Sequence, residues 1–262
     1  MFHLQTNDTF TKKIVMSALL LSLALALKIF SFSIPIAGIA GIRIGFGGPF
    51  LAFIGILFGP FYAAIAYALF DIIGYLLAPQ GAFLWPLTLV AFLKGFSVAF
   101  LWHFIKNVRF KRYNFVYLSI FIGILIVGIV NLVFASFLPI SGYTQWLVSL
   151  GAKVERFSIG ILVAGIVGLC LHGVAWLLLS LNKKGQLFEI YLKLLVCVGV
   201  PALVGTTVNT FILINAFSLN VAFLYFWIPR LIEEIFIILF NTYVLIALMS
   251  VYERVFIKKG SV

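Results

Sequence analysis

Long apolar runs alternate along this chain with short groups of charged residues or of Gly, Pro and Asn. A run of about 17–25 apolar residues is long enough to cross the hydrocarbon core of a bilayer as a helix. The pattern predicts eight such helices, at 13–32, 42–58, 61–78, 83–105, 115–138, 157–181, 188–217 and 224–252. Gly59 and Pro60 separate the second helix from the third without a polar loop. Three glycines and a proline at 45–49 predict that the second helix is short and irregular.

The composition supports lipid as the main solvent. Of 262 residues, 64% are hydrophobic and 10% are charged, whereas soluble domains contain about 45–50% apolar and 25% charged residues. The same hydropathy excludes disorder. Cys170 and Cys197 lie inside apolar runs, which excludes a secreted disulfide scaffold. We therefore predict an all-α integral membrane protein, with residues 1–262 forming a single membrane domain.

The net charge of +11 comes from short basic groups between the apolar runs, with no continuous basic stripe of the kind that binds nucleic acid. Cytoplasmic loops of membrane proteins are rich in Lys and Arg. With both termini in the cytoplasm, the inner segments carry Lys12, Lys13, Lys106, Arg109, Lys111, Arg112, Lys183, Lys184, Arg254, Lys258 and Lys259. The outer loops then carry only Arg43, Lys153 and Arg156. The basic groups share one side only if even numbers of helices separate them, so the charge pattern supports eight helices in the cell membrane.

Sequence motifs of enzymes are absent: the chain has no phosphate-binding loop, no H-E-x-x-H, no G-x-S-x-G and no C-x-x-C. His103 and His172 are each isolated near a helix end, which favours interfacial histidines over metal ligands. We predict no catalytic residues, no metal and no cofactor.

Ionisable side chains inside the predicted helices are informative, because each costs roughly 2.5–3.5 kcal/mol at the centre of a span. They are Asp71, Lys94, Arg230, Glu233 and Glu234. Arg230 and Glu234 are i, i+4 neighbours, so they form either a structural ion pair or part of a site. Asp71 likewise either pairs with another side chain to hold the structure together or takes part in the function. We assign structural polar roles to Asp71 and Glu234.

An outer loop rich in Gly and Pro contains Arg43, next to Phe46. Guanidinium binds carboxylate at two points, so Arg43 either contacts a ligand beneath a cap or snorkels to the interface. Further polar and aromatic residues gather on the same side. Together the expected substrate-binding residues are Arg43, Phe46, Trp85, Thr88, Asn215 and Arg230. Aromatic rings and two cations suit a planar, anionic small molecule, although an aromatic belt also places Trp there.

Small residues line one face of the first helix: Ala18, Ser22 and Ala26 follow one another at a spacing of four. Such rows permit close approach of another helix, but they are also common by chance in apolar segments, so this face is either a partner surface or a chance pattern.

Several stretches of this sequence resemble the substrate-binding S components of energy-coupling factor (ECF) vitamin transporters, most closely the folate branch. Arg-Ile-Gly-Phe-Gly at 43–47 is similar to the loop after the first helix, and residues 55–60 and 68–74 are similar to the second and third helices. Residues 208–210 and 229–234 match the last two helices in order.

The resemblance implies a six-helix, non-enzymatic binding subunit that docks through its first helix onto a transmembrane scaffold driven by two separate ATPases. It covers residues 12–106 and 187–254, so residues 109–184 are expected to be an inserted helical hairpin. We expect folate to be captured outside and delivered inward. Pantothenate, riboflavin or a queuosine precursor are alternative ligands. An intramembrane lipid-modifying enzyme that uses Asp71, Glu233, Glu234 and His172 is the alternative from another class.

Overall fold

The computed structural model describes residues 9–36, 39–79, 82–108, 114–137, 142, 145, 154–180, 186–219 and 222–254. The helices are α1 (Phe10–Lys28), α2 (Gly48–Phe58), α3 (Pro60–Leu77), α4 (Trp85–Ile105), α5 (Asn114–Phe137), α7 (Val154–Ser180), α8 (Gln186–Ala216) and α9 (Phe223–Tyr252). Two strands, β1 (Phe32–Ile36) and β2 (Ile39–Ile44), lie between α1 and α2. Within the described residues, seven helices are long and apolar enough to cross a membrane. The predicted all-α membrane fold is therefore confirmed.

The second predicted helix, at 42–58, is wrong in its first half. Residues up to Ile44 belong to β2, which pairs antiparallel with β1, and α2 begins only at Gly48. Pro49 suits the first turn of a helix, because the amide proton that it lacks has no partner there. With 11 residues, α2 is about 16 Å long, roughly half of the hydrocarbon thickness. The expected cap after the first helix is thus a β-hairpin.

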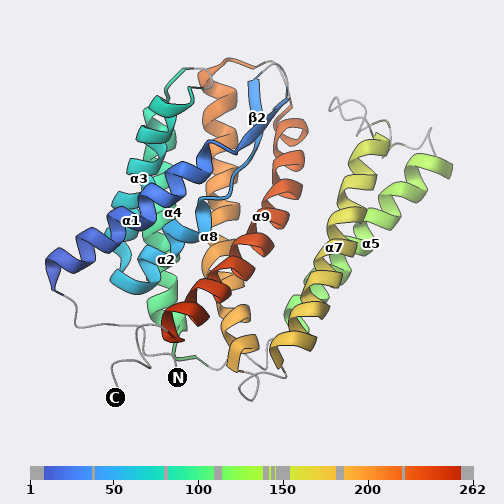
Figure 1. The fold of residues 1–262 in the computed structure, drawn as a ribbon. Coiled ribbons are helices and arrows are strands. Elements are labelled where there is room, and N and C mark those ends of the chain that lie inside the picture. The colour runs from blue at the N-terminus through green and yellow to red at the C-terminus, as the bar shows by residue number, and fades with distance from the viewer. Residues whose placement is uncertain are drawn as a thin grey trace.

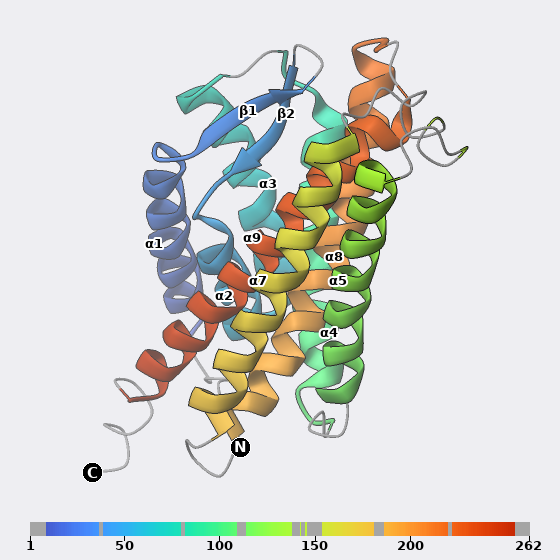
Figure 2. The ribbon, with the colours of Figure 1, turned by 90° about the vertical axis from the view of Figure 1, so that its right-hand side faces the viewer.

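From α3 onward, each successive helix runs from one end of the molecule to the other (Figures 1 and 2), whereas α2 spans only part of that length. The β-hairpin lies at one end. Toward the opposite end, α1 begins and α9 ends, α4 and α7 end, and α5 and α8 begin. The basic segments 109–113, 181–185 and 255–262, and Lys153, lie outside the described residues. The helix ends that flank the three basic segments lie at one end of the molecule, whereas α7, which follows Lys153, begins at the other end, as the charge pattern requires. The assignment of the end with the basic segments to the cytoplasm stays a prediction.

Two groups of helices differ in their burial. α8 is the most buried of the long helices, and it packs against α4 and α9 around the main hydrophobic cluster. α1 is the least buried and contacts α2 and α3. α5 and α7 form an antiparallel pair beside this bundle, and α7 contacts α8 and α9 (Figure 1).

Glycines bring α5 and α7 close together. A Cβ added at Gly128 would lie 2.6 Å from the backbone of Leu162, and one at Gly165 would lie 2.7 Å from the backbone of Leu125. The two contacts are reciprocal, because each helix presents a glycine to the backbone of the other. This close packing is typical of membrane helix pairs, where van der Waals contact replaces the hydrophobic effect.

Candidate functional site

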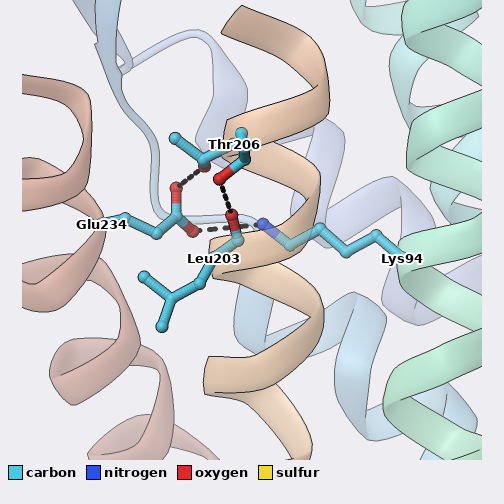
Figure 3. Close-up of polar contacts among 5 residues, drawn as sticks. Lys94, Leu203, Thr206 and Glu234 are labelled. Carbon is cyan, nitrogen blue, oxygen red and sulfur yellow. Dashed lines mark hydrogen bonds and ion pairs between the residues drawn. The ribbon is translucent and has the colours of Figure 1, made fainter. Parts of the chain in front are cut away.

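An ion pair joins α4 to α9 in the interior of the bundle. Lys94 Nζ donates to Glu234 Oε1 at 3.2 Å, and Thr206 Oγ1 on α8 donates to Glu234 Oε2 at 2.6 Å (Figure 3). Glu234 is only 8% exposed. Both carboxylate oxygens therefore have a partner, which is what a buried charge requires. We call Lys94, Thr206 and Glu234 the polar layer.

The i, i+4 ion pair that the sequence suggested between Arg230 and Glu234 is wrong, because Lys94 takes that place. Arg230 instead lies over the ring of Phe226, with 5.5 Å from Cζ to the ring centroid. Its Nη1 is buried without a hydrogen-bond partner. Glu233 and Glu234 lie within electrostatic range of its charge. Arg230 thus keeps a donor available in the interior.

On α8, Asn209 Oδ1 is also buried without a hydrogen-bond partner. Asn209 follows Thr206 by three residues, and Arg230 precedes Glu234 by four. Because α8 and α9 run in opposite directions, both residues lie one turn from the polar layer and on the same side of it, toward the β-hairpin. Asn209 Oδ1 and Arg230 Nη1 thus provide one unpartnered acceptor and one unpartnered donor near the Lys94–Glu234 ion pair.

The segment after β2 leads from the hairpin down along α9. β2 contacts α9, and the rings of Phe46 and Phe240 meet edge to face at 5.5 Å between centroids. A Cβ at Gly48 would lie 3.0 Å from the side-chain amide of Asn241, so any larger residue would require Asn241 to shift. Phe46, in the segment between β2 and α2, therefore packs against α9. The side chain of Arg43 lies outside the described part of the structure, although its backbone pairs with Ser33.

The remaining predicted binding residues lie apart from the polar layer. Thr88 Oγ1 donates to Asp71 Oδ2 at 2.6 Å, which links α4 to α3 and agrees with a structural role for Asp71. Trp85 is 69% exposed at the start of α4. Asn215 is exposed, and its amide donates to the Phe211 carbonyl of its own helix. Of the expected substrate-binding residues, Arg230 lies on α9 and Phe46 packs against α9. Trp85 and Asn215 are exposed and lie away from the polar layer.

Sequence reasoning did not place Lys94, Thr206 or Asn209 in the site. A lysine and a glutamate within two apolar runs are a usable signal, because buried charges require partners. Their pairing could not be read from spacing, since 140 residues separate them. For Thr206 the sequence carries no signal beyond its polarity. Asn209 lies in the stretch 208–210 that resembles the family, but that resemblance assigned it no role.

Small-residue positions on α1 lie on its outward face. Ala18, Ser22 and Ala26 are all exposed, whereas Ala24 and Lys28 are the buried residues of this helix. The predicted docking row therefore does not pack against the rest of the described bundle.

His172 is not the interfacial residue that its isolation in the sequence suggested. It is 2% exposed, with Nε2 2.8 Å from Asn114 Oδ1 and Nδ1 3.3 Å from the Tyr191 hydroxyl. The Tyr243 hydroxyl donates to the neighbouring Leu171 carbonyl. These contacts fasten the α5–α7 pair to α8 and α9. Among the described residues, no three His, Cys, Asp or Glu side chains come together as a metal site would need.

An apolar groove of about 330 Å³ lies between α4 and α8. Lys94 and Ser97 are the polar residues in its lining, and the exposed Leu93 and Val204 lie at its rim. Its lining offers little for a polar ligand to bind, so the interior face of the polar layer is the better candidate site.

Comparison with known proteins identifies the family. A family model described as "ECF-type riboflavin transporter, S component" matches residues 8–154, just over half of the chain. The match runs through α5, so the insertion at 109–184 stays a prediction. No curated protein and no solved structure matches the chain. This chain therefore belongs to the S components of ECF-type riboflavin transporters, which are substrate-binding membrane subunits of ECF transporters.

Proposed function

We propose that this protein binds riboflavin from outside the cell, at a site between the β-hairpin and the polar layer, for delivery inward by an ECF transporter. The observation that carries the proposal is the unpartnered acceptor and donor pair, Asn209 Oδ1 and Arg230 Nη1, one turn from a buried ion pair. Buried polar atoms without partners are rare in proteins, and a ligand that supplies the missing partners accounts for both.

The edge of the riboflavin ring system suits this pair. That edge carries an N–H donor flanked by carbonyl acceptors, so the N–H can donate to Asn209 and a carbonyl can accept from Arg230. The flat ring suits aromatic neighbours such as Phe226 and Phe46, since both lie on or against α9. The name of the matching family, which is a riboflavin transporter family, supports the same ligand.

Folate, the ligand that the sequence resemblance favoured, is the second candidate. Arg230 supports it, because a guanidinium with an available donor binds carboxylate well. The glutamate tail of folate is a dianion, however, and the four charged side chains that the structure describes beside the polar layer balance without it: Lys94 and Arg230 are positive, Glu233 and Glu234 negative. This balance favours the uncharged riboflavin.

The partners follow from the family and from the arrangement of helices. S components work with a transmembrane scaffold and ATPases in the bilayer. We place the scaffold against the exposed row Ala18, Ser22 and Ala26 of α1. The α5–α7 pair packs on α8 and α9, whereas α1 packs on α2 and α3. The α5–α7 pair therefore does not cover the row formed by Ala18, Ser22 and Ala26. We also place both termini in the cytoplasm, because that orientation puts the basic segments on the inner side.

The proposal is tested by titrating the purified protein in detergent with riboflavin and, separately, with folate. We expect saturable riboflavin binding, followed by flavin fluorescence, and no comparable folate binding. Asn209→Leu should weaken riboflavin binding by about 0.5–1.5 kcal/mol, the range for one hydrogen bond. Asn131→Leu is a matched control, because Asn131 bonds to the Val127 carbonyl of α5. Folate binding alone would favour the second candidate, and binding of neither would overturn the proposal.

A further inference from the structure

We infer that Lys28, the last residue of α1, is a positioning residue that orients this helix for docking on the scaffold. The inference rests on the proposed function, because it takes the exposed row Ala18, Ser22 and Ala26 as the docking surface. Lys28 itself lies in neither that row nor the polar layer.

Lys28 is buried, although it belongs to the least buried of the long helices. It is 5% exposed, and Ala24 is the only other buried residue of α1. Lys28 Nζ donates to the Phe70 carbonyl of α3 at 3.2 Å and lies 4.7 Å from the centroid of the Phe70 ring. A lysine near the end of a membrane helix commonly extends its amine to the interface. Here the amine is directed onto α3 instead, so it fastens α1 to α3.

Gly74 on α3 leaves room for this side chain. A Cβ added at Gly74 would overlap with the Cδ, Cε and Nζ atoms of Lys28. Any larger residue at this position would therefore displace the lysine. Because α3 provides both the space and the acceptor carbonyl, the position of the Lys28 side chain is fixed at two points.

The fastened face of α1 lies opposite the docking surface. Successive residues of a helix are rotated by about 100°, so the direction midway between Ala24 and Lys28 lies roughly 140° from Ser22. The partly buried Leu20 and Leu21 pack against apolar neighbours, but hydrophobic contact has no preferred direction. A hydrogen bond does have one. Lys28 therefore sets the rotation of α1 that turns Ser22 and its neighbours outward.

The proposed riboflavin site depends on other helices. The polar layer, Asn209 and Arg230 lie on α4, α8 and α9, whereas Lys28 binds to α3. The β-hairpin has its own contacts with α9, through β2 and through the rings of Phe46 and Phe240. Loss of the Lys28 contact should therefore weaken docking and leave riboflavin binding unchanged.

The expected size of the effect follows from the population of correctly oriented α1. Without its anchor, α1 adopts further orientations, and the apparent affinity for the scaffold falls in proportion to the competent fraction. A hydrogen bond from a charged group is worth roughly tenfold or more in such an equilibrium.

The experiment titrates the purified scaffold and ATPases with this protein in detergent and measures riboflavin affinity in parallel. Lys28→Met keeps most of the side-chain length and removes the amine. We expect half-saturation of the scaffold to need about ten times more of this variant, with the same maximal amount bound and the same riboflavin dissociation constant. A lysine that only stabilised the fold would lower the maximal amount bound and leave half-saturation unchanged.

Gly74→Ala provides a second test, because it displaces the Lys28 side chain without changing the lysine. It should shift half-saturation as Lys28→Met does. The double variant should shift it no further, since both substitutions remove the same contact. Gly123→Ala on α5 is the matched control, because a Cβ there meets nothing within 4 Å, and it should dock like the wild type.

The possible failures are distinguishable. Wild-type half-saturation in both Lys28→Met and Gly74→Ala would overturn the inference alone, as would an equal loss of docking and riboflavin binding in both. A Ser22→Leu variant that docks like the wild type would overturn the proposed docking surface and, with it, this inference. A wild-type protein that docks but does not bind riboflavin would overturn the proposed ligand alone.

Discussion

The helical bundle formed by α1–α4, α8 and α9 and the pair α5 and α7 are both apolar on the outside, but they are held together differently. The bundle encloses the polar layer, with an ion pair and a threonine between α4, α8 and α9. Residues 114–137 and 158–180 of the pair contain no Asp, Glu, Lys or Arg. They pack through the glycine contacts at Gly128 and Gly165 instead.

This difference indicates which region binds the ligand. Charges inside a membrane are costly and are kept where they face a partner or a ligand, so we propose the bundle as the region that binds the ligand. The α5–α7 pair meets it through buried contacts of His172 and Tyr243. Substitutions at the residues of the polar layer should therefore change binding, whereas those in the pair should change stability alone.

The largest expected effect separates transport from binding within the bundle. Replacing Ala18, Ser22 or Ala26 by Leu should abolish uptake and leave ligand affinity nearly unchanged, because these residues point outward from α1 and a bulky side chain blocks close helix approach. The measurement compares riboflavin affinity of the isolated variant with ATP-dependent uptake alongside the scaffold and ATPases. Uptake at the wild-type level would show that this face is not the docking surface.

Breaking the polar layer should cost the most stability. Glu234→Leu leaves the partly buried charge of Lys94, whose side chain is 26% exposed, without its partner. Breaking a fully buried pair typically costs about 3–5 kcal/mol, which is the upper limit for this site. We expect a large fall in the thermal unfolding midpoint and loss of binding. The double variant Lys94→Met/Glu234→Leu should recover most of the stability, because it removes both charges. If the double variant is no more stable than Glu234→Leu, the ion pair is not the cause.

Disturbing the α5–α7 pair should cost less and leave binding intact. Gly165→Leu forces a side chain against the backbone of Leu125, and such overpacking typically costs 1–3 kcal/mol. Gly123→Leu on α5 is the control, since a Cβ there meets nothing within 4 Å. Thermal unfolding and riboflavin affinity measured together test the comparison: a large loss of affinity in Gly165→Leu would contradict it.

The smallest expected effect concerns the junction between the two regions. His172→Phe keeps an aromatic ring but removes the contacts with Asn114 and Tyr191. One net hydrogen bond is worth about 0.5–1.5 kcal/mol, so we expect a modest loss of stability with unchanged affinity. Affinity that falls in parallel with stability would show that the pair helps to position the site.

The sequence by itself determined the solvent and the number of membrane-scale elements. Apolar runs of the right length predicted the seven long helices, because a helix in lipid satisfies its own backbone hydrogen bonds and its length depends only on bilayer thickness. The same rule failed at 42–58, where an apolar strand and a short helix share one run. Hydropathy alone does not distinguish the two, and the pairing of β1 with β2 decides it.

Only the tertiary structure decided which polar groups meet. Local spacing suggested Arg230 as the partner of Glu234, but Lys94 occupies that place from α4. Lys28, at the end of α1, is a second example. It is 5% exposed and donates to the Phe70 carbonyl at 3.2 Å, in space that Gly74 leaves open. The physical reason is common to both: inside a bilayer a charge takes the best partner in three dimensions, and helix packing brings together residues that no sequence period relates.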